Sequence, residues 1–142
     1  MPKILYFNEE VSFLLKHKRK INKWIYNSIV SEERKPGSVN FIFCNDDYLL
    51  KLNQKFLNHN TYTDIITFNY DEQVISGDIF ISLDRVQENA RRLGIQFNDE
   101  LYRIMIHGIL HLVGYKDKTT EEKVKMTEKE DYYLSLLPNF IH

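Results

Sequence analysis

The chain has 142 residues, with 19 Lys and Arg against 20 Asp and Glu, so its formal net charge is −1. This length predicts a single domain over residues 1–142, and the hydrophobic share of 43% is typical of a globular protein with one core. A chain so close to neutral carries no overall basic field, which excludes a strongly basic nucleic-acid-binding protein. Any contact with nucleic acid must therefore depend on local patches.

The single cysteine, Cys44, excludes an internal disulfide and favours a reducing compartment. Its neighbours in Phe-Ile-Phe-Cys predict a buried thiol rather than a nucleophile. Residues 1–7 are too short for a signal peptide and lack a cleavage site, and no apolar run approaches the ~18 residues of a membrane span. We therefore expect a cytoplasmic protein that makes no use of a membrane.

The first part of the chain predicts two strands with a helix between them. Residues 3–7 and 39–44 have the composition of strands, and residues 16–31 place apolar side chains at helical spacing. Pro36-Gly37 is expected to punctuate the connection to the second strand. Asn45-Asp46-Asp47 can cap a second helix that carries apolar residues as far as Leu57.

Two further strands and three helices complete the predicted order. The strands cover residues 64–68 and 78–82 and are joined through a polar turn near Asp71. Three helices follow, over residues 84–93, 98–113 and about 119–137, with Gly94 and Gly114 placed to end the first two. The pattern indicates an α/β (α+β) domain, with a small mixed sheet of about four strands and the histidine-bearing helix at its centre.

That helix contains the most distinctive pattern in the chain. Seven of the ten residues from 104 to 113 are large and apolar, yet His107 and His111 interrupt them at a spacing of four. Residues four apart lie on one face of a helix, so both imidazoles can reach the same cation. A positive backbone angle at Gly114 would let the chain turn back and present Asp117 as a third ligand. Two buried histidines without partners would be costly, which favours a metal over a pair of core histidines.

The same residues match the spacing of the metzincin signature H-E-x-x-H-x-x-G-x-x-H, with two substitutions. Gly108 stands in place of the glutamate that serves zinc peptidases as general base, and Asp117 stands in place of the third histidine. Three ligands with an open fourth position are typical of catalytic zinc sites. The spacing keeps a metalloprotease-like hydrolase as an alternative, and Gly108 argues against it.

The pattern H-G-x-L-H-L-x-G-Y resembles the YbeY family of bacterial metal-dependent endoribonucleases. Further matches occur in the same order along the chain: Leu52-Asn53, residues 63–68, Gly77-Asp78-Ile79, Met126 and Glu130. The resemblance implies a zinc-dependent, single-strand-specific endoribonuclease that matures the 3′ end of 16S ribosomal RNA and acts in ribosome quality control. The implied partners are single-stranded RNA, ribosomal RNA and the small ribosomal subunit, with no DNA expected.

Two positions depart from the family pattern. The family motif ends in Gly-Tyr-Asp-His, whereas this chain has a lysine and then Asp117, and two histidines with one carboxylate also suit iron(II). Leu57 occupies the position where the family places an arginine that is expected to hold substrate phosphate. Lys55 or His59 could replace that arginine, or both could be surface residues.

Two further residues are candidates for the chemistry. Asp64 could orient a water molecule or a ligand's second nitrogen, or it could only cap the turn into its strand. Lys116, with Lys118, would lie close to a phosphate bound at the metal. Glu100 and Arg103 share the helical stripe of the two histidines and could either support the site or form an ion pair within the helix.

The remaining basic residues leave the mode of RNA binding open. Residues 17–20 and Lys23 form a basic cluster that could hold RNA, and a solvated helix face explains that cluster equally well. A third hypothesis is a ribosome-associated factor without catalytic activity, in which the metal only stabilises the fold.

Overall fold

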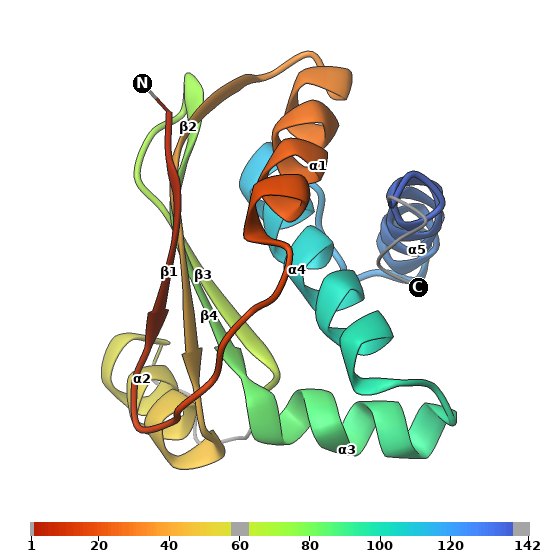
Figure 1. Ribbon diagram of the computed structural model, residues 1–142. Helices are drawn as coiled ribbons and strands as arrows, with labels where there is room; N and C mark the ends of the chain where they lie inside the picture. Colours follow the sequence, from red (N-terminus) through yellow and green to blue (C-terminus); the bar gives the residue numbers. More distant parts are fainter. Residues whose placement is uncertain (1, 58–62, 138–142) are drawn as a thin grey trace.

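The computed structural model describes residues 2–57 and 63–137, so His59 lies outside the described part of the chain. The elements follow in the order β1 Ile4–Asn8, α1 Lys18–Ser31, β2 Lys35–Cys44, α2 Asp46–Leu57, β3 Ile65–Asn69, β4 Val74–Ser82, α3 Leu83–Leu93, α4 Phe97–Val113 and α5 Thr120–Leu134 (Figure 1). This order confirms the predicted α/β (α+β) class.

The four strands form one mixed sheet in the order β1-β2-β4-β3. The strands β1, β2 and β4 are parallel, with Tyr6 opposite Phe41 and Phe41 opposite Ile79. The strand β3 runs antiparallel to β4 and forms the second edge of the sheet. The polar turn between them is closed by Asp71, whose side chain accepts a 2.7 Å hydrogen bond from the backbone of Gln73.

Helices cover the two faces of the sheet unequally. The helices α1 and α4 lie over one face, α5 lies beyond α4, and α2 lies against the other face (Figure 1). Alternate residues of the strands therefore enter different cores, because successive side chains of a strand point to opposite faces. The larger core takes Phe41, Ile79 and Ile81 from the sheet, whereas Ile66 and Cys44 pack with α2.

The helix α4 is the central helix of the domain. It contacts β3 and β4 of the sheet and also α1, α3 and α5. Ten of its 17 residues are buried, as expected for a helix that is apolar on nearly every side. Gln96 is its N-cap, so α4 begins one residue before the predicted start. The prediction of a central helix that carries the two histidines is confirmed.

Three other element boundaries differ from the prediction by three residues or more. The strand β2 begins at Lys35 and contains Pro36 and Gly37, which the sequence analysis assigned to a break before the strand. Proline and glycine are tolerated there because the pairing with β4 is irregular between Pro36 and Val39. The strand β4 starts at Val74, and α5 ends at Leu134 rather than Leu137.

The start of α5 lies close to the predicted residue 119, and Cys44 is buried as predicted. Thr119 caps α5 and forms a capping box with Glu122. Cys44 is buried, and burial, together with the nearby charges of Asp46, Asp84 and Glu9, raises the pKa of its thiol to about 12. Among the described residues, no helix combines the length and apolarity that a membrane crossing requires.

Candidate metal centre

The helix α4 presents both histidines to the same point. Their ring centroids lie 4.4 Å apart with the planes at 86°, so the edge of one ring faces the other. Both side chains are largely buried but not sealed, with 17% of His107 and 23% of His111 exposed. A ligand in solution can therefore reach a pair of imidazoles that the protein otherwise encloses.

The chain turns back at the end of α4 and brings a carboxylate to these rings. Gly114 has φ 124°, a conformation that favours glycine, and its N–H bonds the carbonyl of Leu110 at 3.1 Å. Asp117 Oδ2 then lies 3.2 Å from His107 Nε2 and 3.5 Å from His111 Nε2. The structure thus brings together all three residues that the sequence predicted as ligands.

The separation of these atoms fits a tetrahedral metal ion. One ligand atom from each of the three residues lies within 4.8 Å of the others. Zinc ligands at about 2.0–2.2 Å from the ion in tetrahedral geometry are about 3.3–3.6 Å from one another. The two Nε2–Oδ2 distances are close to that value, and the group of His107, His111 and Asp117 could hold a metal ion.

The other nitrogen of each imidazole is already bonded to the protein. His107 Nδ1 lies 2.5 Å from Glu130 Oε2, and His111 Nδ1 lies 3.0 Å from the carbonyl oxygen of Tyr115. A carbonyl and an ionised carboxylate only accept, and these contacts are shorter than the 3.2 and 3.5 Å from Nε2 of His107 and His111 to Asp117 Oδ2. In the neutral form of each ring the proton therefore lies on Nδ1, and Nε2 keeps its lone pair. This arrangement orients histidine ligands in metal sites.

The two histidines differ in how their surroundings affect their protonation. Burial lowers the pKa of His107, but the hydrogen bond to Glu130 and the charges of Glu130, Asp117 and Asp64 outweigh burial and raise it. Burial and the neighbouring His107 lower the pKa of His111. His111 is therefore more readily neutral and available as a ligand. His107 is protonated over a wider pH range, and a metal ion must then displace its proton.

The two predicted catalytic residues lie in different surroundings. Asp64 lies just before β3. Its negative charge raises the pKa of His107, but less than the charges of Glu130 and Asp117 do. Its side chain accepts a 3.3 Å hydrogen bond from Asn89. Lys116 is exposed in the loop that carries Asp117, so its ammonium group is open to solvent.

Gly108 faces the sheet and not the histidines. A Cβ atom at this position would lie 2.8 Å from Ile79 Cγ2 and 2.9 Å from Ile65 Cδ1. The helix approaches the sheet so closely that a larger side chain would clash with β3 and β4. A glutamate at position 108, as in zinc peptidases, would enter the core, so this position cannot present a general base to the metal site.

Glu130 is the functional residue whose role the sequence analysis missed. In the sequence Glu130 is only a match to the family pattern, and nothing there indicates its contact with His107. Met126, Glu130 and Tyr133 form the buried stripe of α5 at spacings of four and three. A carboxylate in the inward stripe of an otherwise solvated helix is a signal for a buried partner, because such a charge needs one.

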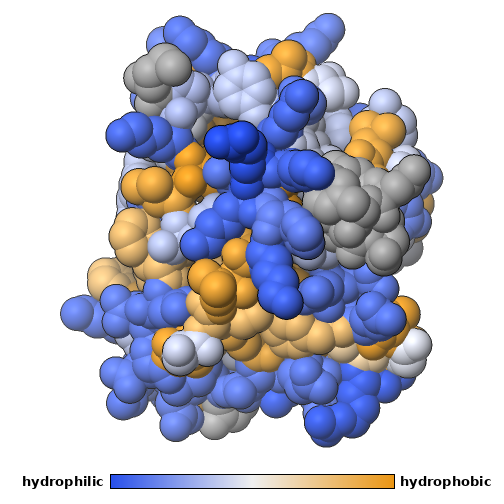
Figure 2. Space-filling model, in the orientation of Figure 1, coloured by the Kyte–Doolittle hydropathy of each residue, from blue (hydrophilic) through white to orange (hydrophobic). Residues whose placement is uncertain are grey.

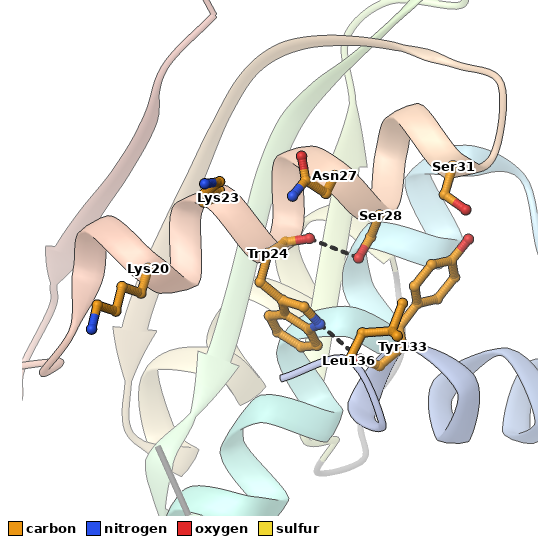
Figure 3. A pocket seen from close by; sticks show the side chains of 8 residues that line it. All are labelled: Lys20, Lys23, Trp24, Asn27, Ser28, Ser31, Tyr133 and Leu136. Atoms are coloured by element: carbon orange, nitrogen blue, oxygen red, sulfur yellow. Dashed lines mark hydrogen bonds between the residues drawn. The ribbon is translucent and has the colours of Figure 1, made fainter. Parts of the chain in front are cut away.

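The basic cluster of α1 lies at a cavity separate from this centre. Hydrophilic side chains gather over α1 on the face shown in Figure 2. A cavity of about 440 Å³ lies between α1 and α5, and Trp24 donates a 2.7 Å hydrogen bond to the carbonyl of Tyr133 beside it (Figure 3). Lys20 and Lys23 line that cavity, and none of the three metal-site residues does.

Known proteins match this chain over nearly its whole length. The family model described as Endoribonuclease YbeY matches residues 5–138. An Endoribonuclease YbeY from Flavobacterium psychrophilum is 47% identical over 133 residues, covering 92% of this chain and 94% of the relative. One from Cytophaga hutchinsonii is 47% identical over 135 residues, covering 94% of each chain.

A solved structure supports the same relationship. The solution structure of TM1509 from Thermotoga maritima is 28% identical, with a TM-score of 0.66 over 95% of this chain and 89% of that one. Sequence similarity and fold therefore agree, and this chain belongs to the YbeY family.

Proposed function

We propose that this protein is a metal-dependent endoribonuclease that hydrolyses single-stranded RNA. The observation that carries the proposal is the convergence of His107 Nε2, His111 Nε2 and Asp117 Oδ2 in a chain whose relatives are named Endoribonuclease YbeY. Three ligands leave a coordination position open, as in catalytic rather than structural zinc sites. The absence of room for a glutamate at Gly108 favours phosphodiester over peptide hydrolysis.

The proposed ligands are His107, His111 and Asp117, and the proposed metal is zinc, one ion per chain. Two imidazoles and a carboxylate form a catalytic zinc set and also suit iron(II), which makes iron the alternative. When bound, a divalent ion supplies Lewis acidity, which polarises a phosphoryl oxygen and makes water acidic enough to ionise near pH ~7.

The protein side chains would provide orientation and charge. In the proposed mechanism, Asp64 accepts a hydrogen bond from the attacking water and so fixes its direction. Lys116 and Lys118 are exposed on either side of Asp117 and would attract the phosphate backbone. Leu57 is exposed at the position of the family's arginine, and its apolar side chain cannot bind phosphate. Lys116 would therefore contribute more to phosphate binding in this protein than in a relative with arginine at position 57.

The biological substrate we propose is ribosomal RNA. Membership in the YbeY family supports action in the cytoplasm at the 3′ end of 16S ribosomal RNA, in contact with the small ribosomal subunit, and in ribosome quality control. A single domain over residues 1–142 would carry all of these activities.

Cleavage assays with three substrates test the proposal. Zinc-loaded protein is incubated with a labelled single-stranded RNA, with the same RNA in a duplex, and with casein, alongside the His111→Ala variant. We expect cuts within the single strand only, and none with His111→Ala or with excess chelator. Cleavage of casein would instead indicate a peptidase. If no substrate is cut while a chelator lowers the melting temperature, the metal has only a structural role.

A further inference from the structure

A chain of polar side chains, of which Glu130 and Glu100 are buried and the others partly exposed, extends from His107 away from the metal centre. Glu130 accepts from His107 through Oε2 and from Arg103 through Oε1, at 2.5 and 3.2 Å. Both carboxylate oxygens of Glu130 are therefore engaged, and its side chain is only 4% exposed. The carboxylate cannot rotate away from His107 without losing the bond to Arg103.

Arg103 is held in turn by a second buried carboxylate. Its Nε and Nη2 donate to the two oxygens of Glu100 at 2.9 and 2.6 Å, a bidentate pair. Glu100 is fully buried, so its charge depends on this guanidinium. One planar group thus bridges Glu100 on its own helix and Glu130 on α5.

The chain continues through α3 to the predicted catalytic acid. Asn89 lies with its side-chain amide nitrogen 3.3 Å from Glu100 Oε2 and 3.3 Å from Asp64 Oδ2. Side chains from α3, α4, α5 and the entrance to β3 are therefore joined in one network. Among the described residues, no buried side-chain nitrogen or oxygen lacks a hydrogen-bond partner, as a stable buried network requires.

We propose that Arg103 is a positioning residue, which fixes Glu130 so that the neutral form of His107 has its proton on Nδ1 and its Nε2 lone pair directed at the metal site before any metal binds. This inference rests on the metal site of the proposed function. The planar fork of arginine is essential to it, because a single ammonium group cannot reproduce the bidentate bond to Glu100 together with the separate bond to Glu130. The hydrogen bonds of Arg103 go to Glu100 and Glu130 and not to the three ligands, so Arg103 acts through Glu130.

The first test compares Arg103→Lys with wild type in metal-free protein. Nitrogen-15 NMR of labelled histidine at alkaline pH, where the rings are neutral, reports which ring nitrogen carries the proton. We expect His107 to change from the Nδ1–H form to a mixture of forms in Arg103→Lys. His111 serves as an internal control, because its Nδ1 bonds a backbone carbonyl that the variant leaves in place.

Metal affinity gives a second readout. Competition with a coloured chelator should show about 10- to 100-fold weaker zinc binding by Arg103→Lys, the usual effect of losing an outer partner of a ligating histidine. Arg91→Lys is the matched control, because Arg91 forms an ion pair at the same spacing of three residues with Glu88 on an exposed surface. The control should bind zinc as tightly as wild type.

A double variant protects the test against simple misfolding. Glu100→Met with Arg103→Met removes both members of the ion pair, so the buried Glu100 carboxylate is not left without its partner. The inference would be overturned if Arg103→Lys or the double variant is folded, keeps the Nδ1–H form of His107 and binds zinc as tightly as wild type. Because the NMR measurement uses neither metal nor RNA, failure of wild type to cut RNA would refute the nuclease proposal and leave this one standing.

Discussion

The hydroxyl group of Tyr115 donates a 2.6 Å hydrogen bond to Glu32, a residue 83 positions earlier in the chain. Glu32 also accepts from Lys129 at 3.1 Å and from Tyr133, so α1 and α5 meet at this carboxylate. The carbonyl of Tyr115 at the same time bonds His111 Nδ1. One residue of the turn after α4 therefore connects a metal-site histidine to a distant part of the fold.

Removal of the Tyr115 hydroxyl should loosen this turn. We expect Tyr115→Phe to lower the free energy of unfolding by about 1.5–3 kcal/mol, the usual contribution of a hydrogen bond to a charged group. Urea titration measures the loss. Tyr132→Phe, which alters an exposed tyrosine of α5, should leave the unfolding midpoint close to that of wild type. Equal stability of Tyr115→Phe and wild type would show that the contact does not anchor the turn.

The same carboxylate predicts a dependence of stability on acid. Burial raises the pKa of Glu32, but hydrogen bonds from Tyr115, Tyr133 and Lys129 outweigh it and lower the pKa below the ordinary 4.5. A lowered pKa means that Glu32 stabilises the fold above pH 4.5 and that this contribution disappears as the pH falls through the folded-state value.

Glu32→Gln should therefore be less stable than wild type at neutral pH, and the difference should shrink below pH 4.5. Thermal unfolding at a series of pH values measures this. Glu128→Gln, on the exposed side of α5, should follow wild type throughout. A difference between Glu32→Gln and wild type that stays constant across the acid range would contradict the assignment.

Gly108 should tolerate no enlargement without cost. In Gly108→Ala the better helix propensity of alanine gains about 1 kcal/mol, whereas overpacking against Ile79 and Ile65 costs about 1–3 kcal/mol. We expect a net loss of stability, measured by chemical denaturation. The Ile65→Val substitution removes the methyl group that would lie 2.9 Å from the new Cβ, so it should recover part of the loss in the double variant. Strict additivity of the two changes would show that this approach is not tight.

Metal binding should weaken in acid, because protons compete for the histidine nitrogens. The raised pKa of His107 places the start of this competition above its ordinary value of 6.5. In Glu130→Gln the carboxylate charge that opposes burial is gone, so the pKa of His107 falls and the decline in affinity begins at lower pH. Zinc affinity measured across pH would show both effects. Identical pH profiles for Glu130→Gln and wild type would contradict them.

The sequence predicted the features that depend on local patterns. The spacing of His107 and His111 and the turn at Gly114 each follow from residues within one or two turns of helix. The order of strands and helices was likewise readable from periodicity. Features that depend on packing between distant elements were not readable.

Glu130 illustrates the limit. It reaches His107 only because α5 packs against α4, and no local rule fixes which of the residues in that stripe faces a given histidine. The contact between Tyr115 and Glu32 depends on α1, α4 and α5 meeting at one point. Pro36 and Gly37 also predicted a break before β2. They lie within the strand because its pairing with β4 is irregular there, and the sequence around them does not show how a distant strand pairs.

Metal content tests the central claim most directly. Protein purified without added metal is analysed by mass spectrometry of the elements, together with Asp117→Ala and with Asp131→Ala, which removes an exposed aspartate of α5. Three ligands for one ion predict about one divalent metal per chain in wild type and in Asp131→Ala, and a large loss in Asp117→Ala. Full retention by Asp117→Ala, or a wild-type protein that takes up no zinc when offered it, would contradict the account.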